Sequence, residues 1–326
     1  MRLHRLVGAV TMLGLLLAGG LFSQEKEKKS AAAGSAKAKA FLGRWDLTLK
    51  APDGEHPSWL ELTMDGDQLK AQMVGRWGNA RPLPKAELSG GKLTFVSPKE
   101  EEGAKSDLVF EGKLAGKGLA GTVNGPDGTT WSWTGVRAPS LKRTGTPKWG
   151  KPVQLFNGND LTGWKAAKSA PTAEWKVENG VLISPGHGPE LINTSQFQDF
   201  KLHIEFNIGK EANSGVYLRG RYEVQVESNS IQEPPSHHTG GVYGFIAASP
   251  EQPRKTDEWQ TYDITLLGRN ITVVQNGTTI IDHQEIPGIT GGALNSHEGL
   301  PGPIYLQGSE DGHIMYRNIV LTPALK

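Results

Sequence analysis

The sequence contains no cysteine. Disulfide bonds, thiolate nucleophiles and zinc–thiolate sites are therefore excluded, and the fold must be held together by its hydrophobic core alone. No charge of one sign dominates, because the formal net charge is only +1, and this balance gives no indication of a nucleic-acid or acidic partner. With 326 residues, the chain is long enough for two domains with sizeable cores.

Long apolar runs are also missing, apart from a short one near the N-terminus. It covers Leu6–Ala18, which is less than the ~20 residues that span a bilayer. Arg2 and Arg5 precede it, and small residues follow it up to Ser23. This order is typical of a cleaved export signal. We expect a signal peptide over residues 1–23 and a periplasmic or secreted protein without stable membrane insertion; an uncleaved anchor is the alternative.

Two β-rich units are predicted after a tether. Residues 24–40 are rich in lysine, alanine and glutamate, and we interpret them as disordered. Residues 41–138 contain short alternating segments divided by turn signals, which favour an antiparallel meander closed into a small barrel similar to lipocalin-type barrels. Its tryptophans are interpreted as core residues rather than as the lining of a ligand cavity. Residues 139–152 are basic, contain proline and glycine, and form the predicted linker.

Residues 153–326 have no helical periodicity and predict a second all-β unit. Asn179-Gly180 and Asn276-Gly277 are strong signals for two-residue hairpins. Between them, residues 201–208 alternate polar and apolar side chains, as a half-buried strand does. We predict an antiparallel sandwich of two sheets with a curved inner face, a jelly roll.

The stretch from Asn213 to Ser228 carries the candidate site. Two short strands are predicted to meet at Gly220, and side chains on a strand change face at every residue. One face of this hairpin is therefore apolar, and the other carries Tyr217, Arg219, Arg221, Glu223, Gln225 and Glu227. Such a polar face is typical of a sugar-sized cleft in a concave sheet; a solvated face with cross-strand ion pairs is the alternative.

A series of short motifs runs in order along residues 153–324. They are Leu155-Phe156-Asn157-Gly158, Asp160-Leu161-Thr162-Gly163-Trp164, Asn213-Ser214-Gly215-Val216-Tyr217-Leu218-Arg219-Gly220, Tyr222-Glu223-Val224-Gln225-Val226, Trp259-Gln260-Thr261-Tyr262-Asp263 and Arg317-Asn318-Ile319. Together they resemble the 3-keto-disaccharide hydrolase domain family. The resemblance implies a concanavalin A-like lectin/glucanase jelly roll, exported in bacteria and acting on oxidised sugars. Many members carry a histidine soon after the late Leu-Gln, whereas here Leu306-Gln307 is followed by Gly308-Ser309-Glu310-Asp311.

The chemistry of a 3-keto-glycoside defines which residues to seek. The ketone acidifies the hydrogen on C2, so a base can form an enolate that expels the oxygen on C1, and water adds afterwards. Glu223 is the predicted base, and Arg219 or Arg221 the predicted partner of the enolate oxygen, although both arginines suit structural salt bridges equally well. The predicted sugar-binding residues are Asn213, Tyr217, Gln225, Glu227, Glu205, Tyr243 and Gln307.

Other functions stay open beside this hydrolase. A β-glucanase-like retaining glycosidase would use Glu223 and Glu227, but it resembles this chain less because Gln225 stands where such enzymes have an aspartate. A glycan-binding module without chemistry and an extracellular scaffold are the further alternatives. For the hydrolase, the glycosidase and the glycan-binding module the expected partner is a carbohydrate. For the hydrolase it is an oxidised di- or oligosaccharide.

The cofactor is left open, with a divalent metal as the candidate. Imidazole and carboxylate groups suit several divalent ions, and His237-His238 and His297-Glu298 could approach Glu223 or Glu205. No ligand spacing supports such a site, so no metal ligands are assigned and these histidines are interpreted as parts of solvated loops.

Overall fold

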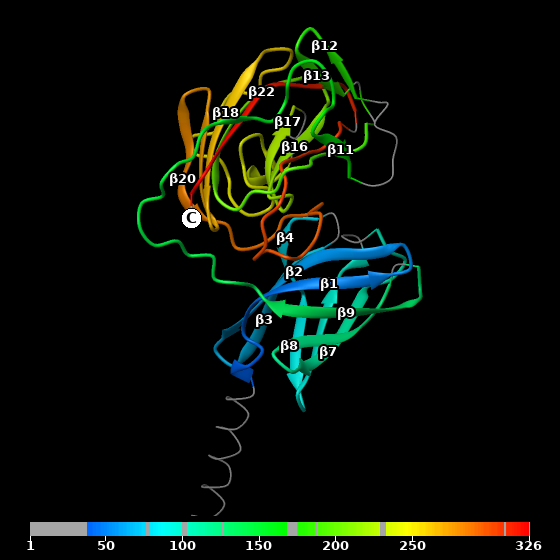
Figure 1. The fold of residues 1–326 in the computed structure, drawn as a ribbon. Helices are drawn as coiled ribbons and strands as arrows, with labels where there is room; N and C mark the ends of the chain where they lie inside the picture. The colour runs from blue at the N-terminus through cyan, green and yellow to red at the C-terminus, as the bar shows by residue number, and fades with distance from the viewer. Residues whose placement is uncertain are drawn as a thin grey trace, which may run out of the picture.

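The computed structural model describes residues 38–75, 78–99, 103–125, 127–167, 175–184, 186, 188–228, 233–309 and 311–325. The predicted signal peptide, most of the predicted tether and Trp77 lie outside these ranges. Two β-rich units follow one another along the chain (Figure 1), so the predicted all-β class is confirmed. In the part of the chain described, no helix is long and apolar enough to cross a membrane.

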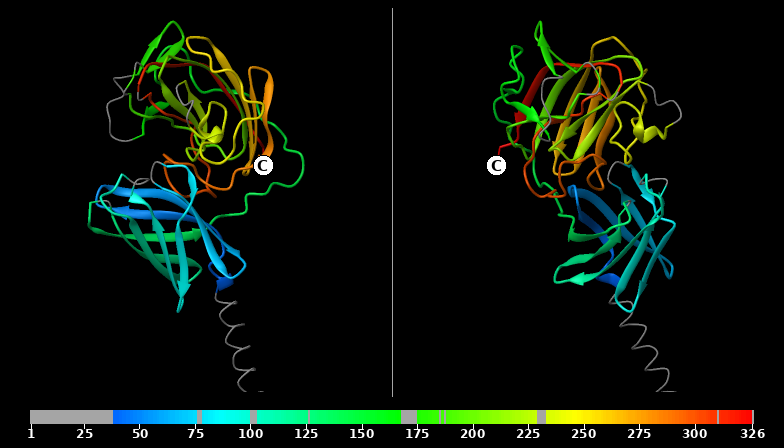
Figure 2. Two further views of the ribbon diagram at one scale, coloured as in Figure 1. Left: turned by 180° about the vertical axis from the view of Figure 1, so that it is seen from behind. Right: turned by 90° about the vertical axis from the view of Figure 1, so that its right-hand side faces the viewer.

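The N-terminal unit is one antiparallel nine-stranded sheet that curls into a partly open barrel (Figures 1 and 2). Its order is β4-β3-β2-β1-β9-β8-β7-β6-β5, so the two meanders are joined by the pairing of β1 with β9. The strands are β1 (Gly43–Ala51), β2 (Gly54–Asp65), β3 (Gln68–Val74), β4 (Ala80–Pro82), β5 (Lys85–Ser89), β6 (Lys92–Ser97), β7 (Leu108–Ala115), β8 (Gly118–Asn124) and β9 (Thr130–Arg137).

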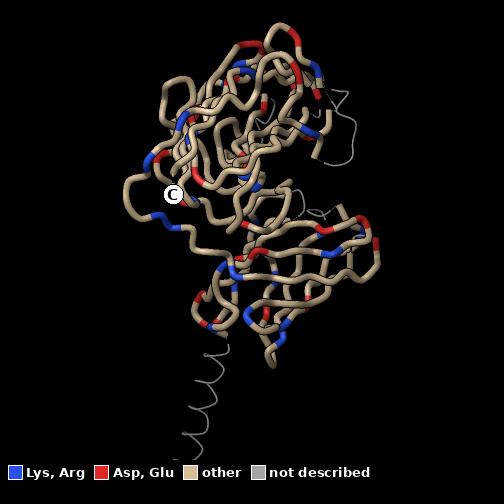
Figure 3. The backbone as a smooth tube through the Cα atoms, viewed as in Figure 1, with Lys and Arg blue, Asp and Glu red and all other residues tan. Residues whose placement is uncertain are grey.

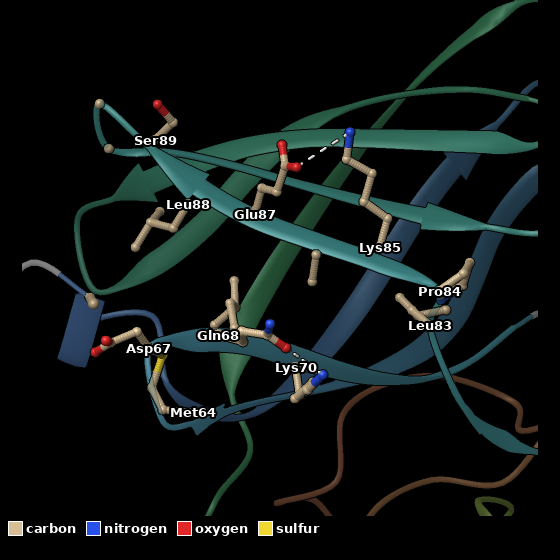
Figure 4. A pocket seen from close by; sticks show the side chains of 15 residues that line it. Met64, Asp67, Gln68, Lys70, Leu83, Pro84, Lys85, Glu87, Leu88 and Ser89 are labelled. Atoms are coloured by element: carbon tan, nitrogen blue, oxygen red, sulfur yellow. Dashed lines mark hydrogen bonds and ion pairs between the residues drawn. The ribbon is translucent and has the colours of Figure 1, made fainter.

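Aromatic side chains fill the barrel. Phe95 stacks on Phe110 with ring centroids 4.6 Å apart, and Trp133 meets both rings edge-on. Trp45 and Trp131 are buried as well, so the core interpretation is confirmed for these three tryptophans. The opening between β3 and β5 forms a cavity of about 950 Å³ with a mixed lining, in which polar residues such as Lys70, Lys85 and Glu87 alternate with apolar ones such as Leu83 and Leu88 (Figure 4). No tryptophan is among its described lining residues.

The C-terminal unit is a sandwich of two antiparallel sheets. The larger sheet has the order β12-β13-β22-β15-β18-β19-β20, with β10 also paired to β22, and the smaller has the order β11-β14-β21-β16-β17. Its strands are β10 (Val153–Gln154), β11 (Trp164–Ala166), β12 (Lys176–Glu178), β13 (Val181–Ser184), β14 (Leu191–Asn193), β15 (Phe200–Ile208), β16 (Asn213–Leu218), β17 (Tyr222–Glu227), β18 (Gln260–Leu267), β19 (Asn270–Gln275), β20 (Thr278–Glu285), β21 (Tyr305–Leu306) and β22 (Ile314–Pro323).

Alternation along the strands builds the core of this sandwich. On β15, Leu202, Ile204 and Phe206 are at most 1% exposed, and they belong to the same apolar cluster as Val216 and Val224 of the smaller sheet. The predicted half-buried strand is thus confirmed. Since the apolar faces of β16 and β17 point into this core, their other faces are left for a site.

Acidic and basic residues are interspersed along both units (Figure 3). The two units have separate apolar cores but also touch. Trp59 of β2 belongs to the core of the C-terminal unit and meets Phe245 edge-on at 5.3 Å. Arg44 of β1 donates to Glu285 at the end of β20. The barrel therefore packs against the sandwich.

Candidate functional site

A polar pocket of about 390 Å³ lies over β16 and β17 on the side away from the core. It brings together six of the residues predicted from the sequence: Asn213, Tyr217, Glu223, Gln225, Tyr243 and Gln307. Six further polar residues line it that the sequence analysis did not select: Glu190, Glu211, Glu233, His237, Tyr305 and Asp311. Five carboxylates and one histidine face this space, and neither lysine nor arginine is among its described lining residues.

Glu223 is held at the floor of the pocket by its neighbours on the hairpin. It lies opposite Tyr217 in the β16–β17 register, and the Tyr217 hydroxyl donates to Glu223 Oε2 at 2.8 Å. The carboxylate also leans over Gly215, where a β-carbon would stand 2.2 Å from Glu223 Oε1. A glycine at this point of β16 is therefore what lets the carboxylate take its position.

The phenols around Glu223 stay protonated. Tyr217 and Tyr305 stack with ring centroids 4.2 Å apart. Burial, followed by the negative charge of Glu223, raises the pKa of Tyr217 well above its usual value. Burial likewise raises the pKa of Tyr305, and Glu190 and Glu223 add to the effect. Both hydroxyls are thus neutral hydrogen-bond donors at physiological pH.

His237 lies at the end of a short 3₁₀ helix, η2 (Pro235–His237), and its ring stacks on Tyr243 at 4.3 Å. Its Nδ1 is 3.0 Å from Glu233 Oε2, and its side chain is buried. Its Nε2 is buried without a hydrogen-bond partner among the described residues. A carboxylate on one ring nitrogen orients the imidazole and leaves the other nitrogen for proton exchange.

The solvated-loop interpretation is wrong for His237 and His238, which are 6% and 8% exposed. His238 is 2.9 Å from both Glu251 Oε1 and the Glu233 carbonyl oxygen, so it ties the loop together. Pro, Ser and Gly surround these histidines in the sequence, and that composition gives no signal that the loop folds back over the sheet.

Neither predicted arginine reaches the pocket. Arg219 is fully buried and donates to the Tyr222 hydroxyl and to the Gly268 carbonyl oxygen. Arg221 donates to Asn295 and to the Leu300 carbonyl oxygen. Both flank the turn between β16 and β17, where Arg219 and Gly220 have positive φ angles of 53° and 65°. This turn interrupts the alternation on which the expectation depended, so the arginines point elsewhere.

Two predicted carboxylates are also outside the pocket lining. Glu227 is 1% exposed, and its Oε1 is 3.0 Å from Arg254 Nε. Glu205 lies on β15 of the larger sheet and accepts hydrogen bonds from Arg317 and Asn318. Burial would raise the pKa of Glu205, but those hydrogen bonds and the Arg317 charge hold it below its usual value. Glu205 is therefore an ionised partner in a structural network.

A metal centre finds no support within the described ranges, because no three or more His, Asp or Glu side chains there are arranged to hold an ion. The pocket can still perform proton chemistry. It holds a carboxylate next to a phenol, an oriented imidazole and several amide groups that can bind hydroxyls. These are the groups that moving a proton on and off a neutral sugar requires.

The fold and this pocket define the class: an all-β sandwich of the jelly-roll type with a carboxylate-rich site on its smaller sheet. Residues 151–322 match the family described as the 3-keto-alpha-glucoside-1,2-lyase-like domain, and the chain belongs to this family. The resemblance inferred from the motifs along residues 153–324 is thereby confirmed.

Similar proteins are bacterial. A 3-keto-disaccharide hydrolase of Bacteroides thetaiotaomicron is 19% identical over 167 residues, which are 40% of this chain and 58% of the relative; the chain thus matches just over half of that relative's length. A structure from Parabacteroides distasonis described as a candidate glycosyl hydrolase is 29% identical and covers 53% of this chain and 84% of its own, with a TM-score of 0.45. The carbohydrate-binding module CBM66 of Bacillus subtilis is 11% identical. The match covers 49% of this chain and 95% of the module, with a TM-score of 0.34.

Proposed function

We propose that this protein cleaves 3-keto-glycosides by removing the proton on C2, eliminating the group on C1 and then adding water. The observation that carries the proposal is Glu223, held by Tyr217 in a pocket that His237 also lines. The family of the chain and the name of its Bacteroides relative support a keto-sugar substrate. A base and an acid on one pocket are what the elimination needs.

The first step is proton abstraction. Glu223 Oε1 takes the proton from C2, and the electrons of the broken C–H bond form the enolate of the C3 ketone. Because the arginines lie elsewhere, the enolate oxygen must be stabilised by neutral donors, such as the Tyr305 and Tyr243 hydroxyls or the amide of Gln225. Hydrogen bonds from these neutral groups stabilise the negative charge on the enolate oxygen without placing a cation in the pocket.

The second step expels the leaving group. The enolate returns its electrons, a C1–C2 double bond forms, and the C1–oxygen bond breaks. His237 Nε2 donates a proton to the departing oxygen, and the Glu233 carboxylate at Nδ1 holds the ring in position for this donation. Water then adds to C1 while a proton returns to C2, with His237 and Glu223 acting in the reverse sense. His237 would thus supply the acid, although this chain has no histidine directly after Leu306-Gln307.

The test is release of 3-keto-glucose from 3-keto-trehalose by the purified protein in deuterated water, with and without a chelator and with divalent metal supplied. Elimination and rehydration place deuterium on C2 of the product, whereas direct displacement at C1 does not. Product without deuterium on C2 would overturn the mechanism. Binding of the sugar without turnover, metal included, would favour a glycan-binding module.

The proposal also includes export to the periplasm or the medium. Its support is the N-terminal order of charged, apolar and small residues. N-terminal sequencing of the protein from its native envelope should find a start between Gly20 and Glu25. An intact Met1 in a membrane fraction would instead indicate an uncleaved anchor.

A further inference from the structure

We propose that the N-terminal barrel is a positioning part of the sugar site, which it holds in shape through two loops of the sandwich. The histidine loop comprises residues 233–246, and the glycine loop comprises residues 286–304. Each loop lines the pocket on one side and packs on the barrel on the other. The inference rests on the proposed function of the pocket and gives the barrel a role in it.

On the pocket side, both loops bond to Glu223 itself. The Glu223 amide donates to Thr290 Oγ1 of the glycine loop at 3.1 Å. The Tyr243 amide of the histidine loop donates to the Glu223 carbonyl oxygen, also at 3.1 Å. The Tyr217 hydroxyl, which holds the carboxylate, is 3.0 Å from the Gly291 carbonyl oxygen. A shift of either loop therefore moves the proposed base or its hydrogen-bond partner.

On the barrel side, the histidine loop packs closely against barrel residues. Gly244 has a φ of 72°, and a β-carbon there would stand 2.7 Å from the side chain of Asn79, just before β4. The next residue, Phe245, meets the Trp59 ring. Tyr243 and His237 are thus positioned by a segment whose neighbours are barrel residues.

The glycine loop meets the same tryptophan. A β-carbon on Gly288 would lie 2.2 Å from Trp59 Nε1, and Trp59 is fully buried. Further along the loop, Ser296 shares a hydrogen bond with Thr48 of β1. Trp59 is therefore one barrel side chain that contacts both loops, and its size fixes the spacing between them.

Trp59→Leu should open that spacing while leaving the barrel's own core intact. Misplacing reacting groups by about 1 Å costs on the order of 10²-fold in rate, so kcat for a 3-keto-glycoside should fall about that far. Trp59→Phe should restore most of it. Trp133→Leu is the matched control, since Trp133 packs on Phe95 and Phe110 inside the barrel; it should lower the melting temperature but not kcat.

A second readout needs no activity. Hydrogen exchange should become faster at the Glu223 and Tyr243 amides in Trp59→Leu and stay unchanged in Trp133→Leu. Thr48→Val, which removes the bond to Ser296, should give a smaller change in the same direction if Trp59→Leu does not fold. Unchanged exchange and kcat in Trp59→Leu would overturn the positioning role. Faster exchange in a protein that never turns over a keto-glycoside would support the positioning and reject the proposed reaction.

Discussion

At the scale of single residues, the proposed reaction depends most on Glu223. Glu223→Gln keeps the shape of the side chain but removes the base. General-base catalysis contributes about 10²–10⁴-fold, so kcat for a 3-keto-glycoside should fall by that factor. Substrate binding, measured by calorimetry, should largely survive, since the interaction lost acts in the transition state.

Glu227→Gln is the control on the same face of β17. Glu227 is covered and paired with Arg254, so its neutralisation should lower the melting temperature and change kcat little. A loss of kcat as large as that of Glu223→Gln, together with cleavage of unoxidised β-glucans, would indicate a retaining glycosidase with two acting carboxylates.

The role of His237 can be separated from a structural one by the choice of leaving group. His237→Asn should lower kcat for a 3-keto-disaccharide by about 10²-fold, because an alkoxide leaves poorly without a proton. A 4-nitrophenyl 3-keto-glucoside releases a stable phenolate and should be cleaved at nearly the unmutated rate. Equal losses on both substrates would show that His237 does not protonate the leaving oxygen.

At the scale of the elements, the alternation of side chains along the strands predicted the β16–β17 hairpin and part of the set of residues that face the pocket. Tyr217, Glu223 and Gln225 share one face because β16 and β17 pair regularly from Asn213–Glu227 to Leu218–Tyr222. The rule failed at Arg219 and Arg221 because the turn with two positive φ angles lies there. His237 was outside the reach of sequence reasoning, since its position depends on a loop that packs against two units at once.

A buried carboxyl group where β1 meets the glycine loop should make the stability of the fold depend on pH. Asp46 of β1 is 2% exposed. Burial first, and then the nearby charge of Glu298, raises its pKa from 3.8 to about 8, although Arg269 and Arg221 oppose this. The folded protein therefore keeps a proton on Asp46 that the unfolded chain loses near pH 4. Stability should fall as pH rises from about 4 to about 8.

Asp46→Asn tests this dependence, because the amide resembles the protonated acid but does not titrate. The melting temperature of the variant should change less between pH 5 and pH 8, and at pH 8 it should exceed that of the unmutated protein. An equal slope in both proteins would show that Asp46 is not the group responsible. Glu285→Gln, at the more exposed contact with Arg44, is the matched control and should leave the slope unchanged.

At the scale of the whole molecule, the composition of residues 139–152 predicted a division of the chain, while the contacts between the units could not be foreseen. Trp59 lies on the face of β2 opposite to Leu60 and Leu62 of the barrel core, and its neighbours Phe245 and Gly288 show that it serves the other core. The linker is itself attached to the sandwich, because Arg143 is paired with Asp199 and the Leu325 amide bonds to the Lys148 carbonyl oxygen.

Limited trypsin digestion should distinguish a divided chain from separable domains. The linker offers exposed basic residues, among them Lys142, Arg143 and Lys148, so cleavage there should give two resistant fragments, near residues 41–138 and 153–326, on a denaturing gel. Under native conditions the nicked protein should still elute as one species, because the barrel buries Trp59 in the other unit's core. Fragments that separate without denaturant would show that the interface is too weak for the barrel to shape the pocket, and a single resistant fragment spanning the linker would contradict the division itself.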